Sequence, residues 1–199
     1  MLGRSGERGD TIIEVMFAFV VFSLVIVGAF TIMGQGMAMA QRSLEITQVR
    51  QQIDSQLLLI KNAQQAVDQT VWGAITQKVS STEPVTLQEL SDTRCQLAPD
   101  NLRSRGAFFL APRTNREGQR IIGLYTPSGA NYQPEATTSS KVEFTSDPRA
   151  QGMFVQIVKA EGANVSRAYD VYITACWPTV GTDKPATIGT VTRLYDVAR

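Results

Sequence analysis

The most informative pattern in the chain is a long apolar stretch near the N-terminus. Positions 15 to 41 contain no Asp, Glu, Lys or Arg, although these four residue types make up 19% of the chain. The run is longer and more uniformly apolar than the core helix of a soluble domain requires. It is long enough for the roughly 20 residues that an α-helix needs to cross a bilayer. We therefore expect a transmembrane helix over residues 10–36.

The pattern becomes amphipathic after Gly36. Apolar residues then recur at spacings that place them on one face of a helix with 3.6 residues per turn. They are Ile46, Val49, Ile53, Leu57, Ile60 and Val67. The opposite side carries Arg42, Glu45, Arg50, Gln51, Asp54, Lys61, Gln65 and Asp68. Since no proline occurs before Pro84, the same helix is predicted to continue to about Trp72, with residues 37–72 as its amphipathic half.

From Pro84 onward, short apolar runs are separated by Pro, Gly, Asn and Asp, which is typical of antiparallel sheet. The predicted strands are 107–111, 120–125, 141–145, 153–159, 167–177 and 187–197. Within the fifth, apolar and polar residues alternate, which predicts one buried face, and the turn 178–185 joins it to the last strand as a hairpin. The prediction is an α+β fold in which the long N-terminal helix packs on an antiparallel β-sheet head formed by residues 73–199.

Composition then removes several classes of chemistry. The chain has 19 Lys and Arg against 18 Asp and Glu, two Cys and no His. Without His, neither Ser-His-Asp catalysis nor His-ligated zinc can be built, and two Cys are too few for a Cys₄ metal site. No pair of carboxylates and no activated nucleophile stands out. We therefore expect no enzyme activity, cofactor or metal site, and the nearly neutral charge gives no general attraction to nucleic acid.

Three interpretations compete for the N-terminal stretch. A cleaved secretory signal has an apolar core of about 7 to 15 residues, which is shorter than this stretch. A plain single-pass anchor fits the length but leaves Glu14 unexplained. A carboxylate at the centre of a membrane helix costs about 2.5 to 3.5 kcal/mol, and less near its end. The third interpretation gives Glu14 a role and depends on the residues around it.

Those residues form the string Gly9-Asp10-Thr11-Ile12-Ile13-Glu14-Val15, which follows a short basic leader. The string resembles the N-terminal signal of type IV pilins and type II secretion pseudopilins, typically Gly-Phe-Thr-Leu-Ile-Glu-Val. The resemblance implies that a prepilin peptidase removes residues 1–9 by cutting between Gly9 and Asp10. It also implies that Glu14 meets the new α-amine of a neighbouring subunit during filament assembly. Asp10 replaces the usual Phe, so methylation of its amine stays open.

The resemblance further implies a structural subunit, more specifically a minor pilin, of a type IV pilus-like filament. Its partners would be the prepilin peptidase, other pilin subunits in a helical filament and the inner-membrane assembly platform. Arg4 and Arg8 precede the apolar stretch and predict a cytoplasmic N-terminus, with the rest exported across the cytoplasmic membrane. A type II secretion pseudopilin and a permanently membrane-anchored binding ectodomain are the alternatives.

The two cysteines, Cys95 and Cys176, lie in the part predicted to be exported. An oxidising compartment favours a disulfide between them, which would tie the segment after the helix to the sheet. Two unpaired small apolar residues are the alternative. Because their spacing differs from the C-terminal disulfide loop of major type IV pilins, this pairing is not implied by the resemblance.

Three further features allow more than one interpretation. Gly28, Gly34 and Gly36 weaken the helix, and they permit either unwinding on assembly or close packing of helices. Residues 126–140 are rich in turn-forming residues and are predicted to form an exposed loop, which either connects strands or contacts a partner. A cluster of arginines is favoured as a solvated, partly paired surface, with contact to DNA or another polyanion as the alternative. Its members are Arg94, Arg103, Arg105, Arg113, Arg116 and Arg120.

Overall fold

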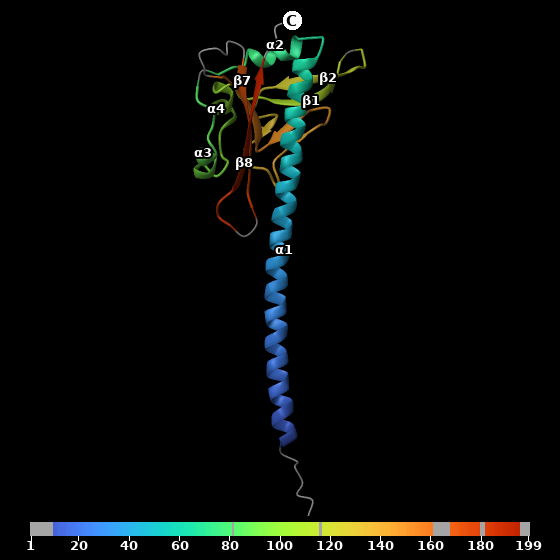
Figure 1. The fold of residues 1–199 in the computed structure, drawn as a ribbon, viewed down its shortest axis with the longest axis vertical. Coiled ribbons are helices and arrows are strands. Elements are labelled where there is room, and N and C mark those ends of the chain that lie inside the picture. Colours follow the sequence, from blue (N-terminus) through green and yellow to red (C-terminus); the bar gives the residue numbers. More distant parts are fainter. Residues whose placement is uncertain (1–9, 81, 116, 161–167, 180–181, 196–199) are drawn as a thin grey trace, which may run out of the picture. The chain divides into compact units, whose positions relative to one another are not determined.

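The computed structural model describes residues 10–80, 82–115, 117–160, 168–179 and 182–195. The chain divides into two compact units, Met1–Ser43 and Leu44–Arg199. Helix α1 (Asp10–Gln65) begins in the first unit and ends in the second. The second unit contains three further short helices and eight strands within the described ranges, so the layout of a long N-terminal helix with antiparallel β-structure is α+β, as predicted (Figure 1).

Helix α1 ends before the predicted position at Trp72. Trp72 instead lies in a separate helix, α2 (Thr70–Thr76). The carboxylate of Asp68 accepts a hydrogen bond from the backbone N–H of Thr70 at 2.9 Å, an Asx-type turn that competes with helix formation. Val67 is 94% exposed and does not belong to the apolar stripe. The predicted continuous helix was therefore wrong over about its last two turns.

In the second unit, α1 buries the rest of the predicted stripe. Val49, Ile53 and Ile60 are buried in the core, and Ile46 and Leu57 pack against it. Beside this stripe runs a row of polar residues at spacings of three and four, which we term the polar seam. Its members are Glu45, Gln48, Gln52 and Gln56. Figure 1 shows this part of α1 running alongside the strands to which the polar seam is bonded.

Each side chain of the polar seam forms a hydrogen bond with the head. Glu45 accepts from the indole N–H of Trp177 at 3.2 Å, and Gln48 accepts from the hydroxyl of Ser139 at 3.4 Å. Gln52 accepts from the backbone N–H of Val142 at 3.3 Å. Gln56 is fully buried and bonds to both backbone groups of Leu110. Glu45, predicted to lie on the solvent side, is half-buried, because the head covers more of the helix than its apolar stripe.

The strands form three small sheets rather than one. Strands β1 (Phe109–Thr114) and β2 (Arg120–Tyr125) make an antiparallel hairpin. Strands β3 (Tyr132–Gln133), β5 (Arg149–Gln151) and β4 (Lys141–Glu143) form a second sheet, in which β3 pairs parallel to β5. The predicted exposed loop 126–140 contains β3, and its Tyr132, Ala136 and Ser140 are buried. That segment is thus part of the packed head rather than a free connector.

The third sheet is an antiparallel meander of β6 (Met153–Lys159), β7 (Ala168–Trp177) and β8 (Ala186–Tyr195). The bounds of β2 and β6 and the β7–β8 hairpin agree with the sequence-based prediction. Strand β7 differs, because all five residues from Ile173 to Trp177 are buried, so both faces of its end are covered. Helix α3 (Leu87–Asp92) packs against β7 and β8, and α4 (Pro99–Ser104) follows it.

Candidate assembly segment and head surfaces

The apolar part of α1 has no covering layer within its own unit. All residues from Ile12 to Ser43 are exposed, including Phe17 at 71% and Phe30 at 69%. By length and composition this helix can cross a membrane, as a single span or as a signal sequence. The hydroxyls of Ser23 and Thr31 donate to the backbone carbonyls one turn earlier, at 2.7 and 2.9 Å. These bonds satisfy the hydroxyls inside the helix and leave an apolar outer surface.

Glu14 is exposed on this apolar helix and is its only charged residue from Thr11 to Gln41. Gly9, on one side of the predicted cleavage bond, lies outside the described residues. Asp10, on the other side, is the first residue of α1, and its side chain is also outside the described part. The structure thus places Glu14 in the second turn of α1.

The three glycines of the apolar segment lie within continuous helix. A Cβ added at Gly28, Gly34 or Gly36 would meet nothing within 4 Å. No contact among the described residues therefore requires a glycine at these positions, although each weakens the helix by about 1 kcal/mol relative to Ala. Their small size becomes useful only where another helix or lipid approaches this surface.

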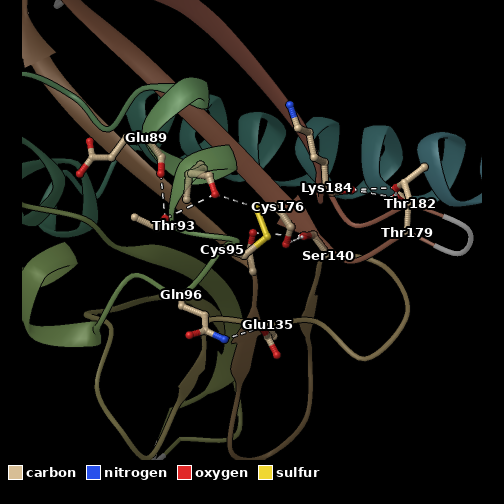
Figure 2. The surroundings of a disulfide bond; sticks show 12 residues. Glu89, Thr93, Cys95, Gln96, Glu135, Ser140, Cys176, Thr179, Thr182 and Lys184 are labelled. Carbon is tan, nitrogen blue, oxygen red and sulfur yellow. Dashed lines mark hydrogen bonds between the residues drawn. A yellow bond between two sulfur atoms is a disulfide. The ribbon is translucent and has the colours of Figure 1, made fainter.

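In the head, Cys95 and Cys176 form a disulfide, with Cα atoms 5.6 Å apart. Cys176 lies near the end of β7, and Cys95 follows α3 with a φ of 65°, a left-handed conformation that is uncommon for a residue other than glycine. Both side chains are buried. Figure 2 shows the disulfide between the Gln96–Glu135 hydrogen bond and the turn residues Thr179, Thr182 and Lys184. The bond fixes the α3 segment to the central strand of the meander.

Two backbone features adjoin the disulfide. The hydroxyl of Ser140 lies 2.7 Å from the carbonyl oxygen of Cys176 and 3.1 Å from that of Gly152, to which it can donate. Gly152 has a φ of 60°, and its carbonyl accepts from the N–H of Cys176 at 2.8 Å. Neither residue can be predicted from the sequence, because a glycine at a strand junction and a serine in a turn-rich segment carry no signal of their own.

A shallow pocket of about 160 Å³ lies beside this region, lined by residues of both charge signs. Its lining residues are Arg94, Glu135, Pro178, Thr182, Asp183, Lys184 and Pro185. No group of three potential metal-ligating side chains occurs in the described ranges. The mixture of two cations and two carboxylates in an open hollow favours no single ligand charge.

The arginine cluster is partly neutralised. Arg105 pairs with Glu89 at 2.8 Å, and both side chains are partly buried. Arg103 lies 4.0 Å from Asp100 on the exposed surface of α4. Arg113 is exposed on β1, and Arg116 is outside the described residues. Because Arg105, one of the five described members, is tied to Glu89, the cluster offers less free positive charge than its sequence suggests.

Glu89 also explains a helix that the sequence analysis missed. Thr86 precedes α3, and its hydroxyl accepts a hydrogen bond from the backbone N–H of Glu89 at 3.1 Å. Thr-x-x-Glu is the sequence pattern of a capping box, so this signal was present in the chain. The cap defines where α3 starts. The segment before α3 crosses the face of the β6–β8 sheet.

Comparisons of the chain with known protein families, with curated proteins and with solved structures gave no match.

Proposed function

We propose that this protein is a structural subunit, more specifically a minor pilin, of a type IV pilus-like filament. Before assembly it would sit in the cytoplasmic membrane with its N-terminus inside and its head exported. The observation that carries the proposal is the uncovered apolar surface of α1 with Glu14 as the single charge between Thr11 and Gln41. The resemblance of residues 9–15 to the prepilin signal implies a role for that carboxylate in assembly.

The proposed mechanism is assembly rather than turnover. A carboxylate inside a lipid or filament core is costly unless a positive charge lies next to it. Cleavage between Gly9 and Asp10 would create an α-amine near Glu14, so an incoming subunit could neutralise the carboxylate of its neighbour. Packing of the apolar α1 surfaces would then hold the filament, and the electrostatic pair would set the register between subunits.

Two alternatives use the same features. A type II secretion pseudopilin would assemble by the same interactions into a shorter filament. A permanently anchored binding ectodomain would keep residues 1–9 and remain monomeric. The contents of the neighbouring genes would distinguish a secretion pseudopilin from a pilus subunit. Removal of residues 1–9 would distinguish either of these from a permanently anchored ectodomain.

Processing is tested with a leader variant. In cells that make prepilin peptidase, Gly9→Leu should leave the full-length precursor in the membrane, because the bulky side chain occupies the position before the cut. Gly6→Leu is the matched control, since it changes another leader glycine and should be processed normally. Mass spectrometry of the purified chains measures the result. Normal cleavage of the Gly9→Leu chain, or no cleavage of the unaltered chain, would reject the prepilin assignment.

Assembly is tested separately with Glu14→Ala. Cleavage should be unaffected, and the amount of the subunit in the sheared filament fraction should fall. Gln35→Ala is the control, because it removes a polar side chain from the same helix without removing a charge. A third chain, with both Asp10→Ala and Glu14→Ala, tests whether Asp10 substitutes for Glu14. Normal incorporation of that double variant would show that no carboxylate at this end of α1 guides assembly.

A further inference from the structure

The outer edge of strand β8 is open in the described part of the chain. The sheet order is β6-β7-β8, and β8 pairs with β7 over its whole length from Ala186 to Tyr195. The opposite edge, on β6, is covered by bridges from Ser80 and Phe108. Among the described residues, no backbone group pairs with the outer side of β8. The meander is therefore closed on one edge and unpaired on the other.

The backbone hydrogen bonds among β6, β7 and β8 identify the residues of β8 whose N–H and C=O groups point away from the sheet. The N–H of Cys176 donates to Gly152, and the carbonyl of Ala168 accepts from Ala160, so the even-numbered residues of β7 direct their backbone groups to β6. Its odd-numbered residues then bond to the even-numbered residues of β8. The backbone groups of Thr187, Gly189, Val191, Arg193 and Tyr195 consequently point away from the sheet. The carbonyl of Tyr195 agrees with this assignment, since it accepts from Gln64 at 2.7 Å.

This edge lacks the features that usually prevent strand addition. Proteins protect an exposed edge with Pro, Lys, a bulge or an unpaired charge. Strand β8 contains neither Pro nor Lys, and its register with β7 is continuous. Its one charged side chain, Arg193, is bound by both oxygens of Asp170 at 2.7 and 2.8 Å. The edge from Thr187 to Arg193 thus carries no unpaired charge, and its outward backbone groups can accept a strand.

An apolar groove lies on the sheet face beside this edge. The segment Pro84 to Leu87 crosses the face, where Val85 is held by a hydrogen bond from its N–H to Gln156 at 2.8 Å. The groove has a volume of about 220 Å³, and no charged residue lines it. Its floor includes Tyr172 and Val191, and Leu87 forms a wall. Leu87 packs closely over Gly189, since a Cβ added there would lie 3.1 Å from a methyl carbon of Leu87.

We propose that the β8 edge and this groove together bind an extended, uncharged segment of a partner protein. The segment adds as a fourth strand next to β8, so its backbone pairs with Gly189, Val191 and Arg193. A side chain opposite Gly189 projects on the same face and enters the groove beside Leu87. This is β-augmentation, in which backbone hydrogen bonds supply affinity and a pocket for alternate side chains supplies specificity. The inference does not depend on the filament proposal.

A second copy of this chain fits less well than an uncharged partner segment. If two β8 strands paired antiparallel about Val191, each Arg193 would lie opposite the Gly189 of the other copy. To enter the apolar groove beside Leu87, the guanidinium would have to leave Asp170, and no carboxylate lies in the lining to replace that partner. Burial of a charge without a partner is unfavourable. The chemistry of the groove therefore selects an apolar side chain.

Amide hydrogen exchange of the full chain in detergent micelles, followed by NMR, tests the inference. Without a partner, the amides of Gly189, Val191 and Arg193 should exchange fast, and those of Ile188, Thr190 and Thr192 slowly. The probe is a capped heptapeptide of alternating Thr and Val with Leu at its centre. At about 1 mM it should slow the three outward amides by about tenfold. A peptide with Lys at its centre is the control and should give much less protection.

Strand variants complete the test. Val191→Pro removes an outward N–H and should abolish protection by the peptide while the ladder to β7 remains. Thr192→Pro is the matched control, because it removes an N–H that serves β7 and should lower the unfolding temperature. Val191→Lys blocks the edge without changing the backbone, in case the proline variant does not fold. Slow exchange of the outward amides without peptide, or no slowing by the peptide at about 1 mM, would overturn the inference.

Discussion

The side chain of Gln56 in α1 forms two hydrogen bonds with the backbone of Leu110 in β1. The N–H of Leu110 donates to Oε1 at 2.9 Å, and Nε2 donates to the carbonyl of Leu110 at 2.8 Å. Gln56 is fully buried, and so is Leu110. The amide group therefore takes the place that a neighbouring strand would occupy, and it fixes the rotation of the helix against the head.

Replacement of Gln56 by Met should destabilise the head strongly. Met is similar in volume but leaves the N–H and C=O of Leu110 buried without partners, which costs about 2 to 4 kcal/mol in total. Gln51→Met is the control, because Gln51 is on the exposed side of the same helix. Urea unfolding followed by tryptophan fluorescence measures both. Similar losses for the two variants would mean that the double hydrogen bond contributes little.

The ion pair between Asp170 and Arg193 should make stability depend on pH at the acid end. Hydrogen bonding from Arg193 holds the pKa of Asp170 below its usual value, against the opposing effect of burial. A lowered pKa in the folded state stabilises the protein above the ordinary pKa of Asp, which is about 3.9. That contribution is lost as the pH falls through the lower value of the folded state.

The measurement is thermal unfolding of the unaltered chain, Asp170→Asn and Arg193→Gln from neutral pH to about pH 2. Each variant should unfold at a lower temperature than the unaltered chain at neutral pH. The gap should close as the pH falls below about 4, because the carboxyl of the unaltered chain then becomes protonated too. At neutral pH the double variant should unfold at a temperature only slightly below that of either single variant. A gap that stays constant down to pH 2 would contradict this account.

Reduction of the disulfide should lower stability without removing a surface contact. Cys95 and Cys176 are 81 residues apart in sequence, and closing a loop of that length contributes about 4 kcal/mol in the chain-entropy model. A chain with Cys95→Ala and Cys176→Ala should unfold at a lower urea concentration than the oxidised chain. Reductant should lower the urea midpoint of the unaltered chain toward that of the double variant and leave the midpoint of the double variant unchanged. An unaltered midpoint in reductant would indicate that the bond does not constrain the unfolded chain.

The sequence allowed prediction of the features that depend on local periodicity. The apolar part of α1, the buried positions Val49, Ile53 and Ile60, and the bounds of β2 and β6 follow from spacings of 3.6 and 2. The helix end was missed because the Asx turn at Asp68 outweighs the apolar spacing of Val67. Helix α3 was missed although Thr86 and Glu89 carry its capping signal.

The remaining features depend on partners that are distant in sequence. Nothing in the local pattern distinguishes Gln56 from the other glutamines of α1, and its burial is determined by Leu110, which lies 54 residues later. Likewise, the alternation in β7 predicted one exposed face, but α3 covers its end. The open edge of β8 could not be predicted either, because strand order in a sheet is a tertiary property. The sequence identified the candidate assembly segment and did not reveal the β8 edge.

Gly152 should tolerate no side chain, because an added Cβ would collide with its surroundings. The cost of this collision can be measured separately from the cost of the positive φ. A Cβ at Gly152 would lie 2.1 Å from the carbonyl oxygen of Cys176 and 2.8 Å from the hydroxyl oxygen of Ser140, so the junction beside the disulfide would have to move. Gly118 also has a positive φ, 78°, but a Cβ there would meet nothing within 4 Å. Gly118→Ala should therefore cost only the backbone penalty, about 1 to 2 kcal/mol.

Gly152→Ala adds the collision to that penalty and should cost about 3 kcal/mol or more. Urea unfolding of both variants under oxidising conditions gives the comparison, and amide exchange at Cys176 reports on the junction directly, since its N–H donates to Gly152 at 2.8 Å. We expect faster exchange at Cys176 only in Gly152→Ala. Equal losses of stability for the two variants would show that the backbone angle, rather than the contact with Cys176, is what requires glycine at position 152.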